Sequence, residues 1–216
     1  NEWLCMQFLR ALSLPTPRTD IARFGEQKAL VVERFDRAFV DKDDGGKWIA
    51  RLPQEDFCQA TGTPPSQKYE ADGGPGIAAG LSLLASSVFA ETDKMLFACA
   101  QLVFWLLAAS DGHAKNFSIF LLPGSAFEMT PFYDVLSAWP VIGKGAGKRP
   151  YQDAKLAMGL RAKNMHRAMQ EVQPRHWRSL AAHTGNDATW PRMLQVVDDA
   201  PAAIDAAALP ANLDGG

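Results

Sequence analysis

The sequence predicts a mainly α-helical domain with small β-hairpins, an α+β fold, in one body of 216 residues. Three observations lead to this prediction. Long apolar segments with helical spacing occupy the centre and the end of the chain. Short runs of β-branched and aromatic residues are separated by turn residues. No repeat or linker divides the chain, and 47% hydrophobic residues suffice for one domain or one large lobe with a sizeable core.

The first third of the chain mixes helices with short strands. Apolar residues at helical spacing before two prolines predict a helix, β-branched residues predict strands, and acidic residues after a proline predict a helix start. The expected elements are a helix at 1–12, a strand at 29–40, a turn at 43–46, a return strand at 48–50, a helix beginning at 53–56 and a loop at 61–76.

The rest of the chain is mostly helical, with one clear hairpin. The apolar run 95–109 would span roughly 22 Å as a helix, short of the ~30 Å of a bilayer core, so it is expected to be a core helix. Thr92 or Asp93 is the expected cap of that helix. The expected elements are helices at 77–90 and 92–109, strands at 117–122 and 126–129, a basic loop at 143–150, an ambiguous segment at 155–172, and helices at 174–185 and 187–208.

Composition excludes several classes of protein. The net charge of −2 gives no global basic field of the kind that nucleic-acid binding requires. Three scattered cysteines without a Cys-x-x-Cys pair indicate reduced thiols in a cytosol and no disulfide framework. No signal peptide opens the chain, and it begins at Asn1 inside an expected helix, which suggests a fragment.

Polar residues with kinase-like spacing follow the core helix. Asp111 and Asn116 are separated by four residues, as in the catalytic loop of protein kinases, and Asp134 follows later in the chain. Phosphoryl transfer needs a carboxylate that orients the acceptor hydroxyl, an Asn on Mg²⁺ and a second Asp on the metal and phosphates. These three residues supply one candidate for each role, in that order.

A hairpin separates the two expected metal ligands. The strands at 117–122 and 126–129 bring their outer ends together, so Asn116 and Asp134 are expected to converge on one Mg²⁺. The alternative interpretation is that Asp111 only ends a helix and Asn116 only caps a strand.

The same motifs resemble the HipA family of bacterial serine/threonine kinase toxins. The resemblance is carried by SDGHAKNFS at 110–118 together with PFYD at 131–134. It extends from residue 1 to about residue 177, and fades beyond. The other matching segments are NEWLCM at 1–6, VERFDR at 32–37, RLPQEDFCQ at 51–59, KYE at 68–70, GGPG at 73–76 and KLAMGL at 155–160.

The resemblance implies a kinase-like C-terminal lobe of the HipA type over residues 1–216. It implies Asp111 as the catalytic base and Asn116 and Asp134 as ligands of Mg²⁺. Asp134 stands in Phe-Tyr-Asp, where ordinary eukaryotic kinases have Asp-Phe-Gly. The residues implied to bind ATP are Glu33, Arg34 and Phe35 as the hinge, with His113, Ala114, Lys115, Asn116, Tyr133 and Asp134, Lys115 being expected to face the γ-phosphate.

The function that the resemblance implies is transfer of the ATP γ-phosphate to a protein serine. The implied substrate is an aminoacyl-tRNA synthetase, usually the glutamyl enzyme, whose modification arrests translation and leads to dormancy. The implied partner is a HipB-like antitoxin, with operator DNA reached only through that antitoxin, in the bacterial cytoplasm and without a membrane.

Two other functions stay open. The chain could be a non-catalytic module that binds the antitoxin or the synthetase. A small-molecule kinase shares the catalytic-loop spacing, but the match at 51–76 argues against it. The basic cluster of Lys144, Lys148 and Arg149 is either a solvated loop or a contact for an acidic partner, RNA or phosphate.

The phosphate-binding half of a kinase is not evident in this sequence. The glycine clusters of this chain, at 73–76 and 143–147, come after the expected hinge. In a kinase the Gly-rich loop comes before the hinge. The chain alone is therefore expected to bind ATP weakly and to transfer no phosphate. If it does transfer, Lys28 or Lys115 would be the first candidate for the missing lysine.

Overall fold

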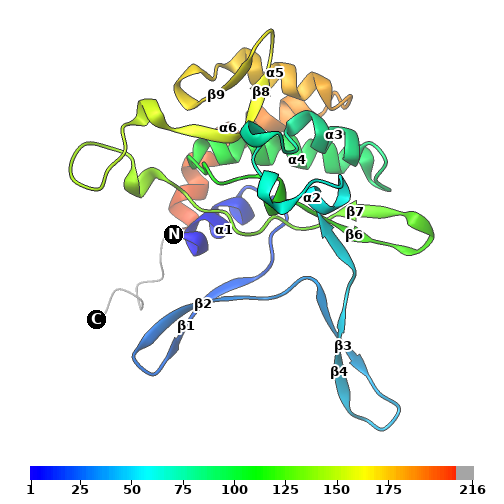
Figure 1. Cartoon of the computed structure of the whole chain (residues 1–216). Coiled ribbons are helices and arrows are strands. Elements are labelled where there is room, and N and C mark those ends of the chain that lie inside the picture. Colours follow the sequence, from blue (N-terminus) through cyan, green and yellow to red (C-terminus); the bar gives the residue numbers. More distant parts are fainter. Residues whose placement is uncertain (208–216) are drawn as a thin grey trace.

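The central helix α4 organises the protein, for which the computed structural model describes residues 1–207. Phe97, Ala98, Cys99 and Ala100 on α4 have no exposed surface, because neighbouring elements cover this helix on nearly all sides (Figure 1). The helices are α1 (Glu2–Ala11), α2 (Phe57–Ala60), α3 (Ile77–Leu84), α4 (Ala90–Leu106), α5 (Pro174–His183) and α6 (Thr189–Ala206).

In the described residues, the strands form four small antiparallel sheets. The three-stranded sheet β5-β6-β7 lies against the helical body, and its register pairs Asp56 with Ser118 and Ile119 with Met129. The strands are β1 (Thr19–Phe24), β2 (Gln27–Val32), β3 (Arg37–Asp41), β4 (Lys47–Arg51), β5 (Gln54–Asp56), β6 (Ser118–Leu121), β7 (Phe127–Met129), β8 (Lys155–Arg161) and β9 (Met165–Ala168).

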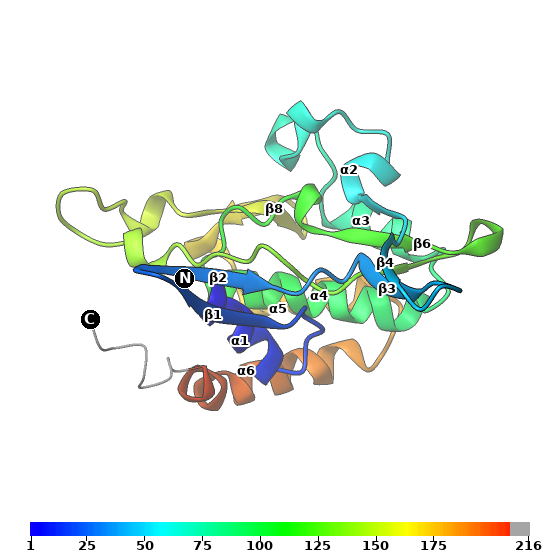
Figure 2. The ribbon, with the colours of Figure 1, turned by 90° about the horizontal axis from the view of Figure 1, so that it is seen from below.

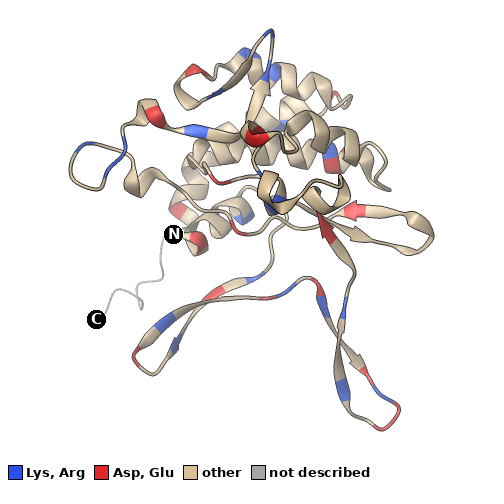
Figure 3. Cartoon of the chain, viewed as in Figure 1, with Lys and Arg blue, Asp and Glu red and all other residues tan. Residues whose placement is uncertain are grey.

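Two hairpins, β1-β2 and β3-β4, reach away from the helical body (Figure 1). In the view from below, both lie on the same side of the body (Figure 2). They carry exposed apolar side chains, including Phe24 at 63% and Phe39 at 75% exposure. Lysine, arginine and acidic residues alternate along both ribbons, so neither hairpin carries a field of one sign (Figure 3).

A cluster of aromatic rings joins the helical body to the three-stranded sheet. The ring of Phe117 lies 4.9 Å from that of Phe97, 5.5 Å from Phe104, 5.6 Å from Phe57 and 6.2 Å from Phe132. All five side chains are buried. Burial of one such ring contributes about 1.5–3 kcal/mol. Asn116, which immediately precedes Phe117, is therefore attached to this buried aromatic cluster.

The predicted combination of helices and small hairpins is confirmed. The helices at 1–12, 174–185 and 187–208 are present as α1, α5 and α6, with residue 208 outside the described part of the chain. The hairpin of β6 and β7 is present as predicted. The ambiguous segment 155–172 begins with the hairpin of β8 and β9. Among the described residues, no helix is long and apolar enough to cross a bilayer.

The strand predicted over 29–40 is wrong as a single element. Strand β2 ends at Val32 and β3 begins at Arg37. Between them the buried carboxylate of Asp36 accepts hydrogen bonds from Arg34 at 2.8 and 2.7 Å and from Arg37. The chain turns a corner between β2 and β3 at this cluster of ion pairs. The sequence prediction also missed β1, which pairs with β2 along its whole length.

Two predicted helix starts are also wrong. In the segment 53–56, residues Gln54–Asp56 form the edge strand β5, and Asp56 caps the helix that follows by accepting a hydrogen bond from the Gln59 backbone N–H at 2.9 Å. Helix α4 begins at Ala90, before Thr92 and Asp93. Asp93 is buried in its first turn, where its carboxylate accepts hydrogen bonds from Ser87 Oγ and from the Met129 backbone N–H. Residues 54–56 are a strand because they pair with β6, and Asp93 lies inside the helix because it binds the Met129 backbone. Both partners are distant in the sequence.

We expect Asp36→Asn to lower the free energy of unfolding at neutral pH, because the charged hydrogen bonds from the arginines are weakened. The loss should be only about 1 kcal/mol, because Arg34 is largely exposed and solvent screens its charge. The hydrogen bond from Arg34 holds the pKa of Asp36 below its ordinary value of 3.8. The wild-type advantage is therefore present above that value and is lost as pH falls through the lowered pKa.

Urea unfolding at pH 6 and at pH 3 measures this difference between the wild type and the variant. A difference that stays the same at both pH values would contradict the assignment. Asp198→Asn, on the exposed face of α6, is the matched control, and its free energy of unfolding should match that of the wild type.

Candidate active site

The loop after α4 is closed by Asn116. The side-chain oxygen of Asn116 accepts a hydrogen bond from the His113 backbone N–H at 3.0 Å, and the Asn116 backbone N–H donates to the His113 carbonyl at 2.9 Å. Ala108, at the exit of α4, has a left-handed φ of 51° that turns the chain toward this loop. Asp111 lies at the outer bend of the loop, with its side chain 59% exposed.

The structure brings Asn116 and Asp134 together. The Asn116 Nδ2 donates a hydrogen bond to Asp134 Oδ2 at 2.8 Å. The hairpin of β6 and β7 makes this contact possible, and the Thr130 N–H donates to the Ser118 carbonyl at 2.9 Å just beyond the paired strands. The two side chains therefore meet, as the sequence predicted, and their binding of a metal stays a prediction.

Asp134 has a strained backbone. Its φ is 56°, in the left-handed region that non-glycine residues adopt at a cost of about 1–3 kcal/mol. The neighbours Phe132 and Val135 are both buried and hold the chain in place, while the Asp134 side chain is exposed. The buried neighbours thus maintain a conformation that aims the carboxylate at Asn116.

Oxygen atoms at this pair suit Mg²⁺, which prefers carboxylate, carbonyl and phosphate oxygens. The Asn116 side-chain oxygen has a second lone pair, and Asp134 uses one of its two oxygens in the bond to Asn116. Among residues 1–207, no group of three or more His, Cys, Asp or Glu is placed to hold a metal. The residues fit a cation whose remaining ligands are phosphate oxygens and water.

Asp111 has a partner that the sequence did not reveal. The hydroxyl of Tyr69 donates a hydrogen bond to Asp111 Oδ1. His113 is buried, and its Nε2 lies 3.8 Å from the same oxygen. Burial, and next the charge of Lys68, lower the pKa of His113, so its ring is neutral at pH 7. The segment KYE at 68–70 carried part of the family resemblance, but nothing in the sequence pointed to a role for Tyr69.

The expected hinge lies beside the site. The ring of Phe35 lies 5.6 Å from those of Phe120 and Tyr133, the residue before Asp134. Glu33 is exposed and donates its backbone N–H to the Arg18 carbonyl at 2.8 Å, while Arg34 is paired with Asp36. The segment is the corner between β2 and β3, not a strand, and its contact with adenine stays a prediction.

Lys115 and Tyr133 have structural contacts. The Lys115 ammonium forms an ion pair of 2.6 Å with Asp56, the cap of α2. The hydroxyl of Tyr133 lies 2.6 Å from Ser118 Oγ and 2.9 Å from the Lys115 carbonyl, and burial raises its pKa to about 12. Ala114 is buried and donates its N–H to the Lys68 carbonyl at 3.4 Å. A γ-phosphate role for Lys115 would require it to leave Asp56.

A comparison with protein-family models matches residues 1–208 to the HipA-like C-terminal domain. The chain belongs to this family. Curated proteins similar to the chain include the serine/threonine-protein kinase toxin HipA of Shewanella oneidensis, 36% identical over 151 residues, and the putative kinase Y4mE of Sinorhizobium fredii, 36% identical over 138 residues. The matches cover 63% of this chain and 33% and 32% of those proteins, so the chain spans about a third of their length.

Solved structures agree with the HipA-like assignment. The chain superposes on the HipA toxin–antitoxin complex of Shewanella oneidensis with HipB and operator DNA with a TM-score of 0.79 and 25% identity, covering 98% of this chain and 50% of that one. A second similar fold is the Helicobacter pylori proinflammatory kinase CtkA, with a TM-score of 0.52 and 12% identity, covering 95% and 84%. The prediction that the chain has a kinase-like fold is thus confirmed.

We expect Gly112→Ala to destabilise the loop between Asp111 and His113. A Cβ at this position would lie 2.3 Å from the ring of Phe104, which is itself packed on Phe117. Overpacking of this kind costs about 1–3 kcal/mol, which chemical denaturation measures. Gly46→Ala, at a hairpin tip where the new Cβ meets only the flexible Asp44 side chain and the neighbouring Lys42, is the control. Equal stability of both variants would contradict the packing described for the loop.

Proposed function

We propose that this chain is the catalytic lobe of an ATP-dependent serine/threonine protein kinase of the toxin–antitoxin type. The observation that carries the proposal is the contact between Asn116 and the strained Asp134, with the exposed Asp111 in the same loop as Asn116. The similarity to a kinase toxin and to a putative kinase supports the same reading.

In this proposal each residue of the site has one task. Asp111 accepts a hydrogen bond from the acceptor serine hydroxyl and orients it toward the γ-phosphate. Asn116 and Asp134 hold Mg²⁺ through their side-chain oxygens, and the metal would neutralise charge on the phosphates. Main-chain groups of Glu33 and Arg34 bind adenine, with Phe35 fixing the segment against Tyr133.

The proposed partners follow from the similar complex. The Shewanella HipA structure contains HipB and operator DNA. We extend this to a HipB-like antitoxin for the present protein, with operator DNA reached through the antitoxin. The substrate proposed is an aminoacyl-tRNA synthetase of the glutamyl type, in the bacterial cytoplasm, with translation arrest and dormancy as the outcome.

Asp111→Asn in the whole protein is expected to reduce phosphoryl transfer by about 10²- to 10⁴-fold and to remove growth arrest. The Asp111 side chain is exposed, so the thermal midpoint should change little. Radiolabelled phosphate transfer and growth after induction are the measurements. A variant that still arrests growth without phosphate transfer would favour the non-catalytic binding module instead.

Asp134→Asn keeps a hydrogen-bond acceptor for Asn116 but removes the negative charge of the carboxylate that would bind the metal. We expect the affinity for Mg-ATP to fall by more than the roughly 10- to 100-fold that even outer-shell partners of a metal cost. Calorimetric titration of the whole protein measures this, with Asp198→Asn as the control. Unchanged affinity would remove Asp134 from the metal site. The same titration on the 216-residue chain tests the prediction that this chain alone binds weakly.

A further inference from the structure

The hydroxyl of Tyr69 is bonded to the proposed catalytic carboxylate. It donates to Asp111 Oδ1 across a sequence separation of 42 residues. The hydrogen bond to Asp111, followed by burial, raises the pKa of Tyr69 to about 12. At neutral pH the phenol is therefore protonated and acts as a donor to the carboxylate, and it does not compete with Asp111 as a base.

The ring of Tyr69 is held against the catalytic loop. It lies edge-on to His113 with ring centres 5.0 Å apart, and the Lys68 ammonium lies over the ring, 5.0 Å from its centre. The Lys68 carbonyl accepts the Ala114 backbone N–H, which ties the two segments together. The contact with Asp111 is thus one of several that join residues 68–69 to the loop.

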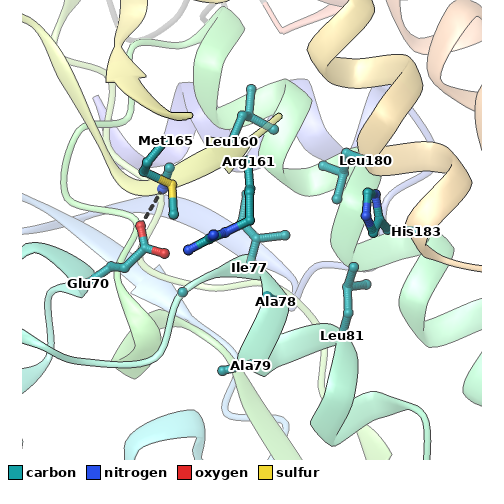
Figure 4. A pocket seen from close by; sticks show the side chains of 12 residues that line it. Glu70, Ile77, Ala78, Ala79, Leu81, Leu160, Arg161, Met165, Leu180 and His183 are labelled. Carbon is teal, nitrogen blue, oxygen red and sulfur yellow. Dashed lines mark hydrogen bonds between the residues drawn. The ribbon is translucent and has the colours of Figure 1, made fainter. Parts of the chain in front are cut away.

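The segment that carries Tyr69 is anchored from behind. The Glu70 carboxylate accepts a hydrogen bond from the Gly159 backbone N–H at 2.7 Å, drawn as the dashed line in Figure 4. It also accepts one from Arg167 at 3.2 Å. Gly76 packs so closely that a Cβ there would lie 1.9 Å from Glu70 Oε1. Glu70 also lines the cavity of about 260 Å³ shown in the same figure. This anchoring restrains the Tyr69 backbone and so limits the positions that its hydroxyl can adopt.

A second cavity opens beside Asp111. It has a volume of about 360 Å³, and Tyr69, Ser110 and Asp111 are among the residues that line it. The other lining residues come from the segment after Asp134 and include Arg149 and Lys155. Asn116 and Asp134 are not among the residues that line it. An acceptor side chain in this cavity would reach Asp111 without crossing the proposed metal site.

We propose that Tyr69 is a positioning residue for phosphoryl transfer, holding one oxygen of Asp111 so that the other is free to orient a hydroxyl acceptor in this cavity. The proposal rests on the kinase function proposed above. Tyr69 exchanges no proton in the reaction, because its hydroxyl remains a donor throughout. Its effect is to restrict the rotation of the Asp111 side chain, which is otherwise exposed.

The first test does not depend on activity. Carbon-13 NMR of the tyrosine Cζ atoms follows the titration of Tyr69, Tyr133 and Tyr151 in the 216-residue chain, with tyrosine-to-phenylalanine variants for assignment. Asp111→Asn should lower the pKa of Tyr69 from about 12 toward about 10. Tyr133, whose high pKa comes first from burial, should not move. An unchanged Tyr69 pKa would overturn the proposed contact.

The second test uses the whole protein. Tyr69→Phe keeps the ring against His113 and removes only the hydroxyl, so we expect kcat to fall about 10- to 100-fold, the range of a hydrogen bond to a charged group. The KM for ATP should stay within about twofold, because the site of Mg-ATP is left intact. Tyr151→Phe, whose ring stacks on Trp139, is the control for the loss of a tyrosine hydroxyl, and its kcat should match that of the wild type.

The outcomes separate the two proposals. If only the ring of Tyr69 matters, Tyr69→Phe will behave as the wild type while Tyr69→Leu loses stability, and the positioning role is refuted. If the wild-type protein transfers no phosphate to any acceptor, the kinase function fails. The NMR titration then still decides whether Tyr69 is bonded to Asp111.

Discussion

The packing of Phe117 is the constraint on which the site depends. This ring sits among Phe57, Phe97, Phe104 and Phe132, and it immediately follows Asn116 in the chain. Because the interior of a protein is close-packed, Asn116 has little freedom to move once Phe117 is seated. Phe132 joins the same cluster two residues before Asp134. Both expected metal ligands are therefore attached to one aromatic core.

The core also explains how the domain tolerates strain close to the site. Ala108 and Asp134 both have left-handed backbones, at a cost of about 1–3 kcal/mol each. Ala108 is fully buried, and Asp134 lies between buried residues. Burial of several aromatic rings stabilises the fold by more than these two costs. The result is an exposed carboxylate on a rigid support, which is what a metal or acceptor site needs.

Local patterns predicted the main helices, the hairpin of β6 and β7 and one long-range contact, but missed β1 and misplaced the strand over 29–40. The convergence of Asn116 and Asp134 followed from strand-turn-strand patterning, because a hairpin dictates which residues meet at its ends. The contact of Tyr69 with Asp111 and that of Lys115 with Asp56 span 42 and 59 residues without a hairpin to link them. Nothing in local periodicity specifies such partners. The same limit applies to residues 33–36, where the pairing of Asp36 with two arginines overrode the strand propensity of their neighbours.

Paramagnetic broadening by Mn²⁺-ATP tests the central claim most directly, because it locates the nucleotide-bound metal and tolerates weak binding. If Asn116 and Asp134 hold the metal, the backbone amide signals of residues 113–117 and 133–135 should broaden first as Mn²⁺-ATP is added to the isotopically labelled chain. Signals outside these two segments should broaden only later in the titration, and Mg²⁺-ATP should reverse the effect. Broadening that begins elsewhere, with these two segments unaffected, would contradict the assignment of the site.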